Sequence, residues 1–149
     1  MNKKDLIQNS KRVVIKIGSA LLVDKQNGSL NSTWLNSLAL DIDNFIKLKK
    51  EVIIVSSGSI ALGKKQLKLK DNLSLDEKQA AAATGQISLA HAWKDTMGKH
   101  GLNIAQILLA PDDTETRRKH LNARATLLKL LELNAVSYTH LTLPTNVAV

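Results

Sequence analysis

Residues 51 to 65 read E-V-I-I-V-S-S-G-S-I-A-L-G-K-K, and this stretch indicates the fold class. Four consecutive apolar residues, Val52 to Val55, are typical of a strand that is buried on both faces of a parallel sheet. After Gly58 the pattern changes to that of a helix, whose first backbone N–H groups have no partner within the helix. Those donors lie at the positive end of the helix dipole and favour an anion. The stretch therefore predicts a buried strand, a turn and a helix whose start can bind an anion.

A second strand with a similar ending is predicted at residues 12 to 17, R-V-V-I-K-I. It breaks into the small residues Gly18, Ser19 and Ala20, and Lys16 lies near its end. A lysine in an apolar strand is costly unless its ammonium group reaches an anion or a solvent-filled cleft. The alternative is that Lys16 is a solvated residue on an edge strand. If the two strands are neighbours, their ends form one polar pocket.

Helices and strands alternate along the rest of the chain. Asn31 or Ser32 can cap an amphipathic helix, and Ser74 with Glu77 forms a capping box before a long helix. The long helix carries a predicted apolar stripe of Ala82, Leu89, Trp93 and Met97. A strand over 103 to 110, closed by Pro111, is predicted next. It is followed by a helix from Asp112 and Glu115 through Leu133 and by a strand that starts at Ala135 and Val136. Residues 1 to 10 are expected to be a frayed lead-in, and residues 64 to 72 irregular. The alternation predicts a three-layer α/β/α sandwich with a mainly parallel sheet.

The composition narrows the function classes. The 149 residues include no cysteine, which excludes disulfides and thiolate metal sites, and no apolar run long enough for a membrane span. We therefore expect a cytoplasmic protein. The net charge of +8 attracts phosphate-bearing partners, but aromatic residues make up only 3%, so platforms for stacking nucleic-acid bases are scarce. A basic nucleic-acid-binding module stays an alternative. The four histidines lack metal-ligand spacing, and no metal site is expected from them.

Residues 58 to 65 nearly match the phosphate-binding pattern G-x-x-x-x-G-K-[ST]. The last position fails, because Lys65 has no hydroxyl group with which to bind magnesium. A P-loop-like nucleotide-binding protein that uses Gly58 to Lys64 remains a second alternative. Ser57 and Ser59 either hydrogen-bond a substrate or cap the following helix, and the residues alone favour capping.

Four short motifs, in this order and spacing, resemble the glutamate 5-kinases, a branch of the amino acid kinase family. The motifs are V-V-I-K-I-G-S at 13 to 19, V-S-S-G-S-I-A-L-G at 55 to 63, A-A-A-T-G-Q at 81 to 86 and L-N-A-R-A-T-L at 121 to 127. The resemblance covers about residues 11 to 136. It implies the amino acid kinase fold and ATP-dependent phosphorylation of the γ-carboxylate of L-glutamate to glutamyl 5-phosphate, the first step of proline biosynthesis. It also implies ATP and Mg2+ as cofactors, and at full length a homo-oligomer is expected.

The resemblance assigns roles to individual residues. Lys16 matches the family lysine that contacts the ATP phosphates and stabilises the charge of the transferring phosphoryl group. Gly18 and Ser19 match the glycine-rich turn that binds the nucleotide. Ser57, with Gly58 beside it, matches the serine position that binds glutamate, and this raises the ligand role of Ser57 above capping. No metal ligand is carried over onto this chain.

The last thirteen residues, 137 to 149, depart from the family. They read S-Y-T-H-L-T-L-P-T-N-V-A-V, rich in threonine, with a proline where a buried strand is due. The first nine resemble a vector- or adaptor-derived peptide. The aspartate-bearing segment and the nucleotide-binding half of the family do not follow. We therefore expect residues 1 to 136 to be the amino-terminal substrate half of a truncated amino acid kinase domain, residues 137 to 149 to be a non-family tail, and the chain alone to be inactive.

Overall fold

The computed structural model describes residues 3 to 108 and 117 to 140, and in these ranges the central feature is a parallel sheet. The strands lie in the order β1-β2-β4-β3, and every neighbouring pair is parallel. Their bounds are Arg12–Ile17 for β1, Glu51–Ser56 for β2, Ile104–Gln106 for β3 and Val136–His140 for β4. Because the strands are parallel, their carboxyl ends meet at one edge of the sheet. The predicted mainly parallel sheet is confirmed.

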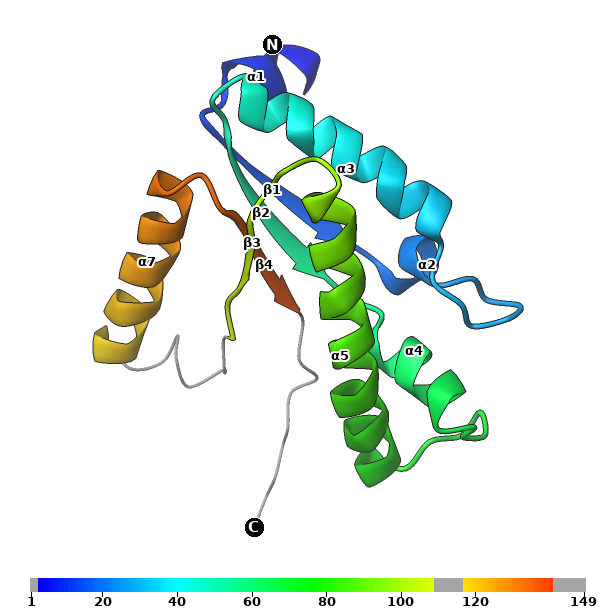
Figure 1. The fold of residues 1–149 in the computed structure, drawn as a ribbon. Helices are drawn as coiled ribbons and strands as arrows, with labels where there is room; N and C mark the ends of the chain where they lie inside the picture. The colour runs from blue at the N-terminus through cyan, green and yellow to red at the C-terminus, as the bar shows by residue number, and fades with distance from the viewer. Residues whose placement is uncertain (1–2, 109–116, 141–149) are drawn as a thin grey trace.

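Helices cover both faces of this sheet. Figure 1 shows α3 and α5 on one side of the sheet and α7 on the other, so the layers are helix, sheet and helix as predicted. The described helices are α1 (Lys3–Asn9), α2 (Ser19–Leu22), α3 (Ser32–Lys47), α4 (Ser59–Gln66), α5 (Leu75–Gly98) and α7 (Arg117–Glu132). None of these helices has both the length and the apolar character needed to cross a bilayer.

The main core lies between the sheet and the pair α3 and α5. Val52 and Ile54 of β2 are fully buried there, as the apolar run in the sequence predicts. The ring of Trp93 packs against that of Tyr138 from β4, with ring centroids 6.0 Å apart. This burial of large apolar side chains fixes the position of the sheet edge relative to α5.

The helix starts follow the predicted capping residues. The side chain of Asn31 accepts a hydrogen bond from the backbone N–H of Trp34, 3.1 Å away, and Ser74 and Glu77 form both bonds of a capping box. The predicted apolar stripe of α5 is correct at Leu89, Trp93 and Met97 and wrong at Ala82. Ala82 is only half-buried, whereas Ala81 is fully buried where α5 lies against Gly63 of α4.

Helices α4 and α5 touch through their backbones at two glycines. A Cβ atom on Gly85 would lie 1.8 Å from the carbonyl oxygen of Ser59, and one on Gly63 would lie 1.8 Å from that of Ala81. Real Cβ atoms do not approach other atoms so closely, and both positions therefore require glycine. The two glycines hold the start of α4 in place beside the carboxyl end of β2.

Two segments are more helical than the sequence pattern predicts. Residues 1 to 10 were expected to be a frayed lead-in, and this is wrong for α1. The ammonium group of Lys50 stabilises the end of this helix, because it donates hydrogen bonds to the backbone carbonyls of Gln8 and Ser10 at 2.8 and 2.6 Å. The irregular segment expected from Lys64 begins later, because α4 continues to Gln66.

Strand β4 runs four residues beyond Val136 into the segment that the sequence pattern separates from the family. Ser137 and Tyr138 are buried, and both pair in register with β2 and β3. The expectation that the α/β pattern ends at Val136 is therefore wrong for Ser137 to His140. The small hydroxyl side chain of Ser137 and the aromatic side chain of Tyr138 both fit a buried strand. The foreign origin of residues 137 to 149 stays a prediction. Residues 109 to 116, with Pro111, Asp112 and Glu115, lie outside the described residues, as do residues 141 to 149.

Candidate functional site

The carboxyl ends of β1 and β2 lie side by side, which meets the condition that the sequence set for a shared polar site. Lys16 pairs in register with Val55, and the backbone N–H of Ser57 donates to the carbonyl of Ile17 at 3.0 Å. This bond joins the two chain segments just where each strand ends. The candidate residues from both segments are thus brought to one edge of the sheet.

Gly58 forms the contact between the two turns. Its φ is +114°, in the left-handed region that favours glycine, and it is buried. A Cβ atom at this position would lie 3.4 Å from a methyl carbon of Val23 and 3.8 Å from the Cα of Ser19. The turn after β2 therefore packs directly on the turn after β1.

The turn after β1 presents open backbone. Gly18 precedes the short helix α2, and no atom lies within 4 Å of the place where its Cβ would be. Ser19 and Lys16 are exposed, and Lys16 forms no ion pair with the residues that the structure describes. Lys16 lies on β1, which is an edge strand of the described sheet.

The residues after β2 form a helix that begins at a glycine. The N-cap of α4 is Gly58, which has no side chain, so neither Ser57 nor Ser59 occupies the capping position. Residues 59 to 66 are helical, and Gly63 is used for contact with α5. The segment from Gly58 to Lys64 is therefore not a loop that wraps a phosphate, and the P-loop alternative loses its structural basis.

The end of β4 lies beside the end of β2 and brings partly buried groups to this edge that sequence reasoning missed. His140 pairs in register with Ser56, and burial lowers the pKa of its imidazole, which favours the neutral ring. Next along the same face, the hydroxyl of Tyr138 lies 3.3 Å from the amide nitrogen of Gln86 on α5, and burial raises the pKa of this tyrosine. Periodicity could not place these groups, because their proximity depends on sheet order.

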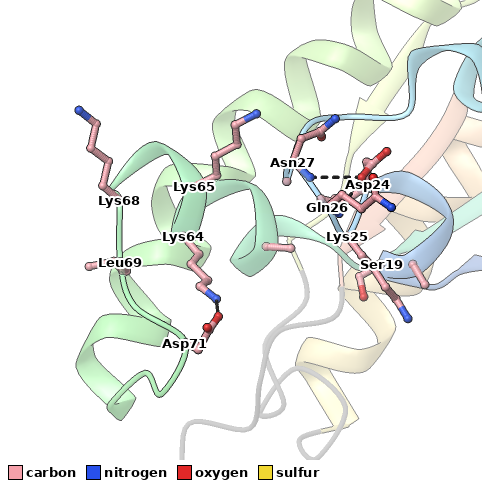
Figure 2. Close-up of a pocket in the computed structure, with 14 residues that line it drawn as sticks. Ser19, Asp24, Lys25, Gln26, Asn27, Lys64, Lys65, Lys68, Leu69 and Asp71 are labelled. Carbon is pink, nitrogen blue, oxygen red and sulfur yellow. Dashed lines mark hydrogen bonds and ion pairs between the residues drawn. The ribbon is translucent and has the colours of Figure 1, made fainter.

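A pocket of about 490 Å³ opens beside this site. Figure 2 shows that its walls come from the loop after α2 and from α4 with the turn that follows it. Ser19 and Ala20 line it, whereas Lys16, Ser57 and Gly58 do not. Lys64, Lys65 and Lys68 of this pocket belong to the segment, residues 64 to 72, for which the sequence predicted only irregular structure.

Acidic and histidine side chains do not form a metal-binding cluster in the described part of the chain. No group of three or more histidine, cysteine, aspartate or glutamate residues lies close enough there to hold a metal ion.

Comparison with known proteins agrees with this geometry. The profile described as "Amino acid kinase family" matches residues 11 to 140. The chain belongs to this family. The match includes the candidate residues at the ends of β1 and β2, and it extends through the whole of β4.

Relatives within the amino acid kinase family carry the name glutamate 5-kinase. The chain is 54% identical over 127 residues to the glutamate 5-kinase of Paramagnetospirillum magneticum (strain ATCC 700264 / AMB-1), which covers 85% of this chain and 34% of that protein. It is 53% identical over 131 residues to the enzyme of Gluconobacter oxydans (strain 621H), at 87% and 35% coverage. The chain thus spans about a third of the length of these relatives, and the resemblance noted in the sequence is confirmed.

Solved structures support the family fold. An isopentenyl phosphate kinase from T. acidophilum superposes with a TM-score of 0.57 at 13% identity, over 89% of this chain and 57% of that one. A UMP kinase from Bacillus anthracis gives a TM-score of 0.58 at 18% identity, over 87% and 52%. At these identities the likeness concerns the fold alone.

Proposed function

We propose that the chain is the substrate half of an ATP-dependent kinase that converts L-glutamate to glutamyl 5-phosphate, the first step of proline biosynthesis. The observation that carries this proposal is the junction of the two turns: the hydrogen bond from Ser57 to Ile17 and the contact of Gly58 with Ser19 place both family motifs at one edge. Identity of 54% to a glutamate 5-kinase over these same motifs supports glutamate as the acceptor.

The reaction requires positioning more than covalent chemistry. An oxygen of the γ-carboxylate forms a bond to the γ-phosphorus of ATP, the bond from that phosphorus to the bridging oxygen breaks, and ADP leaves. Two anions must be held in line while negative charge is neutralised. In our proposal Lys16 supplies positive charge to the transferring group, and Ser57 with the free N–H groups at the start of α4 binds glutamate.

The residues present fit a nucleotide phosphate at the turn after β1. The open space at Gly18 lets a phosphate approach the backbone, and exposed Ser19 adds a hydroxyl donor beside it. ATP supplies the phosphoryl group, and Mg2+ bound to its phosphates neutralises part of their charge.

The chain alone is expected to show no glutamate-dependent formation of ADP, because its sequence matches only about a third of the glutamate 5-kinases. A coupled ADP assay with L-glutamate and ATP measures this. The folded state should be checked in the same sample by circular dichroism. Turnover that requires both substrates and survives removal of trace contaminants would contradict the expectation.

Ser57 can be tested in a hybrid enzyme in which residues 11 to 136 of this chain replace the matching segment of the Paramagnetospirillum magneticum enzyme. Changing Ser57→Ala removes a hydrogen bond to a charged substrate, and the KM for glutamate should rise about tenfold or more while the KM for ATP stays unchanged. Ser37→Ala, on the exposed face of α3, is the matched control. Equal KM values for glutamate in both variants would exclude Ser57 as a glutamate ligand.

A further inference from the structure

The third sequence motif, residues 81 to 86, has no part in the roles proposed above, and its last residue is Gln86. Figure 1 shows the first half of α5 beside α4 and the second half beside the sheet, and Gln86 lies in the middle of this helix. The residue before it, Gly85, touches the backbone of Ser59 at the start of α4. Gln86 is therefore one residue from the contact that holds the start of α4 in place.

The two ends of the Gln86 amide have different surroundings. The amide nitrogen donates a hydrogen bond to the hydroxyl oxygen of Tyr138 on β4, 3.3 Å away. The amide oxygen, Oε1, is buried and accepts no hydrogen bond from the residues that the structure describes. A buried acceptor without a donor is costly, and such an atom suits a ligand that brings a donor of its own.

Tyr138 holds the amide in this orientation. Its side chain is buried, and its ring packs against that of Trp93 from the same helix as Gln86. Burial raises the pKa of the tyrosine hydroxyl, which therefore stays uncharged at neutral pH. A packed aromatic ring keeps its hydroxyl in one place, so the bond to the amide nitrogen leaves Oε1 as the end of Gln86 that can bind a ligand.

The chemistry of L-glutamate identifies the group that Oε1 can bind. Both carboxylates of L-glutamate only accept hydrogen bonds, and the α-ammonium group is the donor that it carries at neutral pH. In an extended glutamate, four covalent bonds place the ammonium nitrogen about 5 Å from the γ-carboxyl carbon. With the γ-carboxylate at Ser57 and the start of α4, the ammonium group needs an acceptor on a neighbouring element, and α5 is the helix that touches this point.

We propose that Gln86 is a specificity-determining residue, whose Oε1 accepts a hydrogen bond from the α-ammonium group of the substrate. This inference rests on the glutamate site proposed above. Gln86 then selects an amino acid over glutarate, the dicarboxylic acid of the same length without the ammonium group, because glutarate would leave Oε1 buried and unpaired. Tyr138 is a positioning residue that acts through the amide of Gln86.

Binding of L-glutamate and of glutarate to the ¹⁵N-labelled 149-residue chain can be followed by NMR. The side-chain amide signal of Gln86 is identified by its loss in the variant Gln86→Met. We expect both ligands to shift the backbone signals of Ser57 and Gly58, and only L-glutamate to shift the Gln86 amide. From the concentration dependence of these shifts, L-glutamate should bind about tenfold or more tightly than glutarate, the usual effect of one hydrogen bond to a charged group.

Three variants sharpen this test. Gln86→Met keeps the length of the side chain without its acceptor, and it should weaken L-glutamate binding about tenfold and leave glutarate binding unchanged. Gln66→Met is the matched control, because it makes the same exchange at an exposed position of α4, and it should bind both ligands as the wild type does. Tyr138→Phe removes only the hydroxyl group; it should reduce the preference for L-glutamate, and it serves if Gln86→Met does not fold.

Three outcomes would overturn the inference. If Gln86→Met binds L-glutamate as tightly as the wild type, water alone pairs with Oε1. If L-glutamate shifts the signals of Ser57 and Gly58 but not that of Gln86, the proposed glutamate site stands and the contact with the ammonium group is refuted. If L-glutamate shifts none of these signals, both the contact and glutamate binding by this chain are refuted.

Discussion

Replacing Gly85 with alanine is expected to prevent stable folding of the chain. The new methyl group would lie 1.8 Å from the carbonyl oxygen of Ser59 and 2.6 Å from the backbone nitrogen of Gly63, so α4 and α5 would have to separate. Overpacking against backbone costs about 3 kcal/mol or more, a large part of the roughly 5 to 15 kcal/mol that stabilises a domain. Thermal unfolding followed by circular dichroism measures the loss.

Gly98→Ala is the control for this substitution. Gly98 is the last residue of the same helix, and no atom lies within 4 Å of its would-be Cβ. Alanine there should leave the melting temperature unchanged or raise it slightly, because alanine has the higher helix propensity. If Gly85→Ala melts at the same temperature as Gly98→Ala, the backbone contact between α4 and α5 is not as the structure has it.

Replacing Lys16 with alanine in the hybrid enzyme is expected to lower kcat about 10²- to 10³-fold, the usual cost of losing one group that stabilises transition-state charge. Lys16 is exposed and unpaired among the described residues, so its removal breaks no ion pair there and should leave the melting temperature unchanged. Lys94→Ala is the control. A hybrid that keeps its kcat without Lys16 would show that this lysine is only a solvated residue of an edge strand.

Local signals in the sequence predicted the elements that carry the site. Three such predictions were correct, because each depends on neighbours along the chain. They are the apolar strand before Gly58, the strand that contains Lys16, and the capping of two helices by Asn31 and Ser74. The parallel pairing of β1 and β2 followed from the alternation of strands and helices. The fold class and the meeting of the two turns could therefore be predicted without coordinates.

Features that depend on contacts between distant segments could not be predicted. The two close glycine contacts between α4 and α5 have no periodic signal, and the burial of Ala81 beside one of them was not predicted. The burial of Ser137 and Tyr138 depends on pairing with β2 and β3. The basic pocket needs the 23 to 28 loop beside α4, and the sequence separates these by a helix and a strand.

The activity of the unmutated hybrid enzyme tests the central proposal most directly. Glutamyl phosphate can be trapped with hydroxylamine, and its formation measured with L-glutamate and ATP in a hybrid that carries residues 11 to 136 of this chain. We predict product that requires both substrates, at a rate within about tenfold of the parent enzyme, since half of the matched residues are already identical. A hybrid that folds like the parent but forms no glutamyl phosphate would contradict the proposal that this chain is the substrate half of a glutamate kinase.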